Sequence, residues 1–131
     1  MNNADLDKEV KRLVHLSRYE KGYVCPVDIL MQLDYLSKND YENWRFGRVD
    51  YLEKVCKINL RKLTLINKLI RKHSKDLGLQ ESWTAYNKFG KGVKKRLRFS
   101  KSGKQTIENA YSTHYIDKDR ITELKENNAS M

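Results

Sequence analysis

The chain has 131 residues, of which 39% are hydrophobic and 34% are charged, and it carries a net charge of +10. This length suits one domain, and the regular recurrence of apolar residues excludes a disordered chain. No apolar run approaches the ~18 residues that span a membrane, and the polar, acidic N-terminus is unlike a secretory signal. We therefore expect a cytoplasmic protein without a membrane partner, with one globular domain over residues 1–126 and a frayed tail over residues 127–131.

Three helices are predicted in the first third of the chain. The first begins at a cap on Asn3 and ends by Gly22. After an extended segment, Pro26 should occupy the first position of a second helix, because its fixed φ suits that place. Ser37 then opens a third, short helix. The apolar positions expected to face the core are Leu6, Val10, Leu13, Val14, Val27, Leu30, Met31, Leu33 and Leu36.

Aromatic and arginine side chains crowd around Gly47. The group consists of Tyr41, Trp44, Arg45, Phe46 and Arg48. Such groups occur at stacking sites and protein interfaces. The other interpretation, which we favour because large aromatic side chains are usually buried, is that Trp44 and Phe46 close the core. The two arginines would then pair with acids such as Asp40, Asp50 and Glu53.

The strongest periodicity lies in residues 58–77, which predict one long amphipathic helix at the centre of the fold. Its start is open between a cap on Asn59 and a continuation from Leu52, while Gly78 suits a left-handed C-cap. The apolar side carries Leu63, Ile66, Leu69, Ile70 and Leu77. The opposite, basic side carries Arg61, Lys68, Arg71, Lys72 and Lys75.

Residues 83–99 alternate with period two on both sides of Gly90-Lys91-Gly92, which predicts a two-stranded β-hairpin. Residues 82–107 hold eight basic side chains and no acid, so they supply most of the net charge. The basic face is expected to carry Thr84, Tyr86, Lys88, Lys94, Arg96, Arg98 and Ser100. The apolar face is expected to carry Trp83, Ala85, Phe89, Val93, Leu97 and Phe99, with Lys95.

Ser102 and Gln105 have the spacing of a capping box and predict a final helix over residues 104–116. From Asp117 onward the charges alternate, which is compatible with a short exposed helix that frays after Lys125. Together these elements predict an α+β fold, mostly α, with about five helices around the long helix 58–77 and the basic hairpin 83–99. The order of helices followed by a hairpin resembles that of a winged-helix module, in element order only.

The sequence offers few groups for catalysis. His114 falls on an apolar stripe, where we expect it to pack, and neither a phosphate-binding loop nor a metal-ligand spacing is present. Cys25 and Cys56 lie far apart in the chain and are expected to be reduced thiols, with a disulfide between them as the alternative. We therefore expect no metal or cofactor and favour a binding protein over an enzyme.

Three functions remain open. We favour binding of nucleic acid, either DNA or RNA, because basic side chains around the Tyr86 ring would neutralise phosphates while the ring stacks on a base. The alternatives are an adaptor or inhibitor that binds an acidic protein, and a small nuclease-like enzyme. A hairpin whose charge merely prevents aggregation is the plainer interpretation of the same residues. The expected nucleic-acid-binding residues are Tyr86, Lys88, Lys91, Lys94, Arg96, Arg98, Lys101, Arg61, Lys68, Arg71, Lys72 and Lys75.

Overall fold

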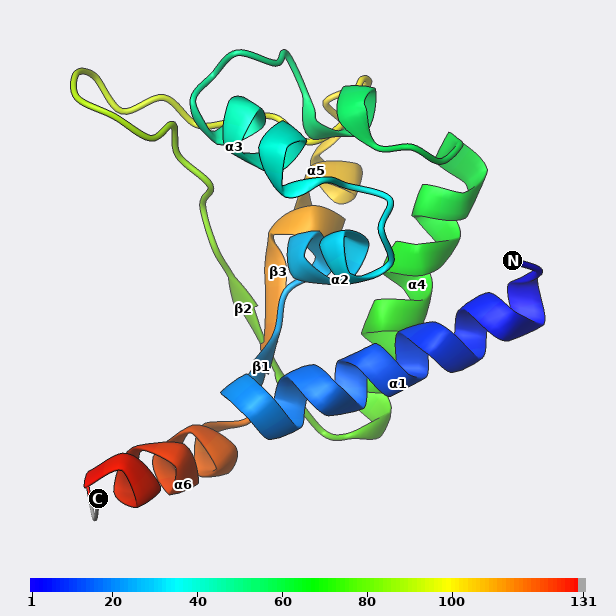
Figure 1. Cartoon of the computed structure of the whole chain (residues 1–131), viewed down its shortest axis with the longest axis vertical. Coiled ribbons are helices and arrows are strands. Elements are labelled where there is room, and N and C mark those ends of the chain that lie inside the picture. Colours follow the sequence, from blue (N-terminus) through cyan, green and yellow to red (C-terminus); the bar gives the residue numbers. More distant parts are fainter. Residues whose placement is uncertain (130–131) are drawn as a thin grey trace.

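The computed structural model describes residues 1–129, and its helices surround a small antiparallel sheet (Figure 1). The helices are α1 (Asn3–Lys21), α2 (Pro26–Gln32), α3 (Lys38–Arg45), the 3-10 helix η1 (Leu52–Val55), α4 (Leu60–Asp76), α5 (Gln105–Ser112) and α6 (Lys118–Ala129). The strands are β1 (Tyr23–Val24), β2 (Gln80–Trp83) and β3 (Thr113–Ile116). The predicted α+β class, mostly α, is confirmed. The tail predicted over residues 127–131 falls partly on residues 130 and 131, which lie outside the described part.

Polar side chains cap the helices where the sequence indicated, with one shift. The Oδ1 atom of Asn2 accepts a hydrogen bond from the backbone N–H of Asp5 at 2.8 Å, so the cap predicted on Asn3 is wrong by one residue. Ser37 caps α3 as predicted. Asn59 caps α4, which answers the open question of where the long helix starts. Each cap pairs a backbone N–H that the helix itself leaves unpaired.

The core is built around α1 and α4, which pack against each other (Figure 1). Their buried stripes agree with the prediction, because apolar residues three and four apart share one side of a helix. With 19 residues, α1 is longer than α4 with 17, so two long helices share the central position. The buried apolar side chains on these helices are Leu6, Val10, Leu13, Val14, Leu63, Ile66, Leu69 and Ile70.

A polar pair also joins α1 to α4. The buried His73 on α4 places its Nε2 atom 2.5 Å from Oδ1 of Asp7 on α1. This hydrogen bond lowers the pKa of the Asp7 carboxyl group below its ordinary value. A lowered pKa in the folded state stabilises the fold at pH values above the unfolded-state pKa, and this stabilisation is lost as the pH falls through the folded-state pKa.

We therefore expect the Asp7→Asn variant to lose less stability than the parent protein on acidification. Above about pH 5 the Asp7 and His73 pair should make the parent more stable to unfolding than the variant. This difference in stability should shrink progressively below about pH 4, where carboxyl groups protonate. Urea unfolding of both proteins across this range measures the difference. Parallel acid limbs for the two proteins would show that the Asp7 and His73 pair adds no pH-dependent stability.

The sheet has the order β1-β3-β2 and is antiparallel throughout. The helix predicted over residues 104–116 is wrong at its end, because α5 ends at Ser112 and the chain continues as β3, the central strand of the sheet. The β-branched and aromatic residues of β3 suit a strand that pairs on both sides. The capping box is also wrong, since Ser102 accepts from the neighbouring Lys104 backbone and caps no helix.

Residues 83–99 form an irregular ribbon in place of a regular two-stranded hairpin. Its first limb begins within β2, and beyond Trp83 the two limbs share one isolated bridge between Asn87 and Arg96. The ribbon projects from the body of the molecule as an arm (Figure 1). Residues paired across antiparallel strands point to the same face, so this register turns Tyr86 and Leu97 inward.

The predicted positions of Trp83, Tyr86 and Phe89 on the first limb are therefore reversed, whereas Lys88 is exposed as predicted. Tyr86 is only 7% exposed, whereas Trp83 is 49% and Phe89 39% exposed. A register that differs by one residue moves every side chain of a limb to the other face. On the second limb Leu97 and Phe99 are buried as predicted. Val93, at the tip of the arm, is exposed because the arm extends beyond the core.

The aromatic group around Gly47 is divided between core and surface. Trp44 is fully buried, as we favoured, whereas Phe46 is 41% exposed and rests against Phe89 with 5.6 Å between ring centroids. The predicted pairing of Arg45 and Arg48 with acids is wrong, because both donate to neutral oxygens. The helix α3 ends at Arg45, so the residues that follow reach toward the arm and not into the core.

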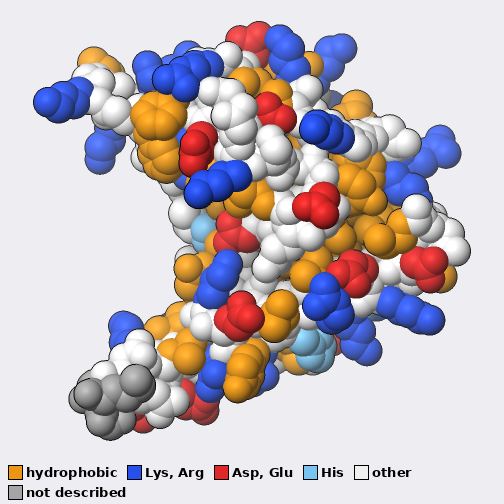
Figure 2. All heavy atoms as spheres, in the orientation of Figure 1, with side chains coloured by type: hydrophobic (Ala, Val, Ile, Leu, Met, Phe, Trp, Pro, Cys, Tyr) orange, Lys and Arg blue, Asp and Glu red, His pale blue; other side chains and the backbone are white. Residues whose placement is uncertain are grey.

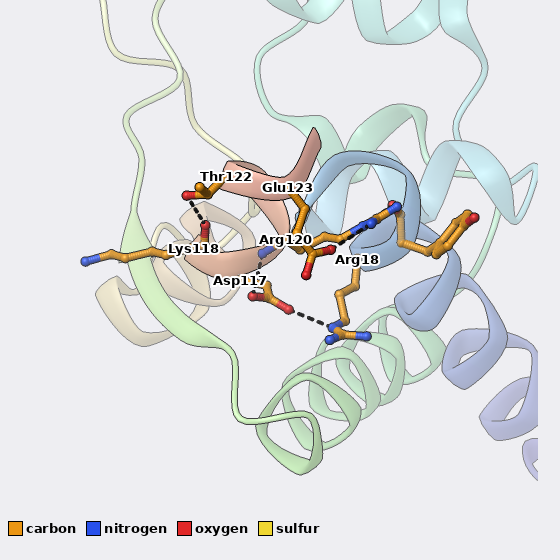
Figure 3. A network of polar contacts seen from close by, with 7 residues as sticks. Arg18, Asp117, Lys118, Arg120, Thr122 and Glu123 are labelled. Atoms are coloured by element: carbon orange, nitrogen blue, oxygen red, sulfur yellow. Dashed lines mark hydrogen bonds and ion pairs between the residues drawn. The ribbon is translucent and has the colours of Figure 1, made fainter. Parts of the chain in front are cut away.

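Helix α6 is attached to the end of α1 by polar contacts (Figure 3). Arg18 Nε donates to Asp117 Oδ2 at 2.8 Å, and Arg120 Nε donates to the Tyr19 carbonyl at 2.8 Å. Gly22 has a left-handed φ of 82°, and a Cβ atom there would lie 2.5 Å from Ile121, so the close approach requires glycine. An otherwise exposed helix is thereby held in one place.

The two cysteines are free thiols, as predicted. Burial raises the pKa of Cys25 and of Cys56 to about 12 in each case, so both remain protonated at neutral pH. Among the described helices, none is both long and apolar enough to cross a membrane.

Candidate nucleic-acid interface

The structure exposes every basic residue that the sequence proposed for binding. Those on α4 are Arg61, Lys68, Arg71, Lys72 and Lys75. Those on the arm and the loop after it are Lys88, Lys91, Lys94, Arg96, Arg98 and Lys101. In the space-filling view, several Lys and Arg side chains lie along the projecting arm, and the surface is hollowed between the arm and α6 (Figure 2).

Tyr86, the proposed stacking ring, is not on this surface. Its ring packs against Trp44 and Phe99 at centroid distances of 5.7 and 5.3 Å, and its hydroxyl group lies 2.9 Å from Nε2 of His114. Burial raises the pKa of the phenol far above its ordinary value. The expected position of Tyr86 on the basic face is therefore wrong, and its ring is part of the core.

Trp83 takes the exposed position that the sequence assigned to Tyr86. It ends β2, where it pairs with Thr113 of the central strand, and about half of its surface is accessible. The guanidinium group of Arg96 lies 4.9 Å from the centre of the indole ring. An arginine over an indole is a favourable cation–π arrangement that orients the guanidinium group at the surface.

A groove of about 640 Å³ extends from Trp83 to the basic side of α4. It lies between α4, the β2–β3 face of the sheet and α5. Lys68 and Arg71 line it from α4, so it brings together parts of the helix face and the arm that are separate in the sequence. Its polar lining comprises Thr64, Asn67, Thr106, Asn109 and Thr113. Among the described residues that line it, Glu81 is the one acid. Its Oε1 atom lies 3.7 Å from Nε of Arg71.

Of the twelve residues proposed for the site, Lys68 and Arg71 line the groove, Arg96 reaches it through its contact with the Trp83 ring, and the others do not line it. The Arg98 guanidinium group donates to the carbonyl groups of Ser100 and Lys101 at 2.8 and 2.9 Å, so it stabilises the loop after the arm. The carboxylate of Glu108, for which the sequence predicted no structural role, accepts from the backbone N–H groups of Phe99 and Ser100. We therefore assign Arg98 a mainly structural role and centre the candidate interface on Arg96.

The opposite face of the sheet gathers several groups that we considered for catalysis. His114 lies on β3 and not on a helix, and it is close to Thr84 and Tyr86 in a cavity that Cys25 also lines. Burial lowers the pKa of His114 and raises those of Cys25 and Tyr86, so all three are neutral at pH 7. The described residues include no cluster of three or more His, Cys, Asp or Glu side chains able to hold a metal ion.

Comparison of the chain with family models, with curated proteins and with solved structures found no match.

Proposed function

We propose that the chain is an intracellular nucleic-acid-binding protein that holds a single strand of DNA or RNA in the groove between α4 and the sheet. The observation that carries the proposal is the exposed Trp83 ring, with Arg96 stacked on it and Lys68 and Arg71 in the same groove. Single-strand binding surfaces combine basic side chains along the backbone with an aromatic ring for the bases.

The chemistry of the groove suits this ligand in detail. Arg71 and Arg96 would neutralise phosphates on the two sides of a base stacked on Trp83. The amide and hydroxyl groups of Asn67, Asn109 and Thr106 offer donors and acceptors to sugars and base edges. A duplex keeps its bases stacked inside, so it would gain the phosphate contacts without the ring contact.

The charge contribution is tested with the double variant Arg71→Ala and Arg96→Ala. We expect weaker binding to every single strand and a flatter plot of log affinity against log salt, by about 0.7 for each phosphate that is no longer neutralised. Fluorescence anisotropy with a labelled oligonucleotide across a salt series measures both quantities. Because Arg96 and Arg71 are exposed, the fold should remain intact.

The matched control is Arg12→Ala with Arg48→Ala, which removes two exposed arginines that were not proposed for binding and neither line the groove nor contact Trp83. This control should keep most of the parent's affinity. Equal losses in the two double variants would mean that net charge, and not the groove, determines binding. If the parent protein binds neither nucleic acid nor heparin but does bind an acidic protein, the adaptor function would be favoured.

A further inference from the structure

A second cavity, of about 490 Å³, lies on the face of the sheet opposite the groove. Successive residues of β3 alternate between the two faces, so Thr113 and Tyr115 line the groove while His114 and Ile116 line this cavity. The other charged or titratable side chains that line it are Tyr23, Cys25, Asp28, Tyr41, Arg45 and Tyr86.

Arg45 is the unusual member of this lining. Its guanidinium carbon lies 4.0 Å from the centre of the Phe89 ring and 5.0 Å from that of Tyr86, while its NH groups donate to the Tyr41 hydroxyl and the Asn87 carbonyl. No described carboxylate forms an ion pair with it, and its buried Nε–H has no acceptor. A fixed, half-buried guanidinium group without a counter-ion favours an anion.

Neutral hydroxyl and imidazole groups line the same cavity. The ring of His114 lies between the Tyr86 hydroxyl at 2.9 Å and the Thr84 hydroxyl at 3.3 Å. Asp28, which would repel an anion, is itself 3.2 Å from the ammonium group of Lys21. The cavity therefore combines an unpaired cation with hydroxyl and imidazole groups, and its acid is already paired.

We propose that this cavity is a second, independent site, in which Arg45 and Thr84 bind the oxygen atoms of a phosphate group and His114 supports Thr84. The guanidinium fork matches two oxygens of a tetrahedral anion, and the Thr84 hydroxyl can donate to a third. His114 acts through Thr84, because its two ring nitrogens face the Thr84 and Tyr86 hydroxyl groups. A dianion next to His114 favours the protonated ring, in which both ring nitrogens donate. Anion binding should therefore be coupled to proton uptake by His114.

Sulfate is the first probe, because it keeps the same charge across the range in which histidine titrates. We expect the NMR signals of the His114 ring to shift saturably with sodium sulfate and not with sodium chloride of equal ionic strength. Sulfate should raise the pKa of His114, with at least about fivefold tighter binding at about pH 5.5 than at about pH 7.5. The signals of His15 and His73 are internal controls, because neither side chain lines the cavity.

Variants separate this site from the groove. Arg45→Gln should weaken sulfate binding about tenfold or more, and His114→Gln should remove its pH dependence. Arg45→Lys, which keeps the charge and loses the fork, should bind with intermediate affinity and serves if Arg45→Gln does not fold. Arg71→Gln, on the other face of the sheet, should leave the His114 response unchanged. A His114 response that is absent, or that Arg71→Gln abolishes as fully as Arg45→Gln, would overturn the proposal.

The source of the phosphate is identified by competition with bound sulfate. Displacement by thymidine 5′-monophosphate alone would assign the site to a small phosphorylated molecule. Displacement by an oligothymidylate without terminal phosphates would assign it to the backbone of a nucleic acid. Either result supports a phosphate site, and failure of both compounds to displace sulfate would contradict it. These measurements report on His114 and sulfate and not on the Trp83 groove. A failure of the proposed single-strand binding could therefore be told apart from a failure of this phosphate site.

Discussion

Replacing Trp44 with alanine should lower the free energy of unfolding by roughly 3–5 kcal/mol, as expected for a buried aromatic side chain. The ring is fully buried and contacts Tyr86 and Phe99, with the centroid of the latter 5.1 Å away. Its Nε1–H donates to the carbonyl of Arg98 at 2.8 Å. Trp44 thus connects α3 to both limbs of the arm, and its loss should also release the arm from the body. Urea unfolding measures the stability change.

Two further variants show where this effect arises. Trp44→Phe keeps an aromatic ring but removes one of two donors to the Arg98 carbonyl, which still accepts from the Leu52 backbone N–H. A smaller loss of about 0.5–1.5 kcal/mol is therefore expected from the missing hydrogen bond. Phe46→Ala, two residues away and 41% exposed, should cost much less than Trp44→Ala. Equal costs for Trp44→Ala and Phe46→Ala would contradict the position of the core described here.

The helical part of the fold was largely predictable, because the information that determines it is local. The periodicity of residues 58–77 located α4, and Pro26, Ser37 and Asn59 act at helix starts as their chemistry indicates. The error at Asn3 is of the usual kind, since two neighbouring asparagines suit a cap equally well. The pairing of His73 with Asp7 depends on how α1 and α4 are packed, and no local pattern reveals it.

The sheet was not predictable from local patterns, because its strands come from three distant segments. β3 lies within a stretch whose spacing also fits a helix, and pairing with β1 and β2 decides in favour of a strand. The regular hairpin predicted over residues 83–99 is an irregular ribbon, and the face of its first limb depends on the Asn87 and Arg96 bridge. Alternation alone determines which residues share a face and leaves open which face is buried.

The same register explains what was right and wrong about the candidate site. The basic residues of α4 and the arm are exposed as expected, since charged side chains are rarely buried. The aromatic member was misplaced, because Tyr86 and Trp83 belong to opposite faces of the first limb. The groove itself arises where α4, the sheet and α5 meet, which requires the tertiary structure.

Trp83→Ala should weaken binding to single strands by about 1–3 kcal/mol, or roughly 5- to 150-fold, through the loss of base stacking. It should leave the salt dependence nearly unchanged, because every phosphate-neutralising side chain is still present. Binding to a duplex should hardly change. Trp83→Phe, which keeps a smaller ring, should recover part of the loss. Anisotropy titrations of the three proteins, with single and double strands at several salt concentrations, separate these effects.

A loss shared equally by single and double strands would contradict a stacking role for Trp83, as would a variant that binds like the parent. Because half of the Trp83 surface is exposed at the end of β2, its substitution should leave the core intact. The melting temperature of Trp83→Ala checks this, and a large decrease would mean that the ring has a structural role.

The most direct test of the groove is the NMR signal of the Trp83 indole N–H during titration with a short single-stranded oligonucleotide. Trp44 provides the second indole signal in the same spectrum, and it is buried and bonded to Arg98. If a base stacks on Trp83, the Trp83 signal should move progressively and saturate at the stoichiometry of binding, while the Trp44 signal stays in place. Binding that saturates without moving the Trp83 signal would contradict the proposed interface.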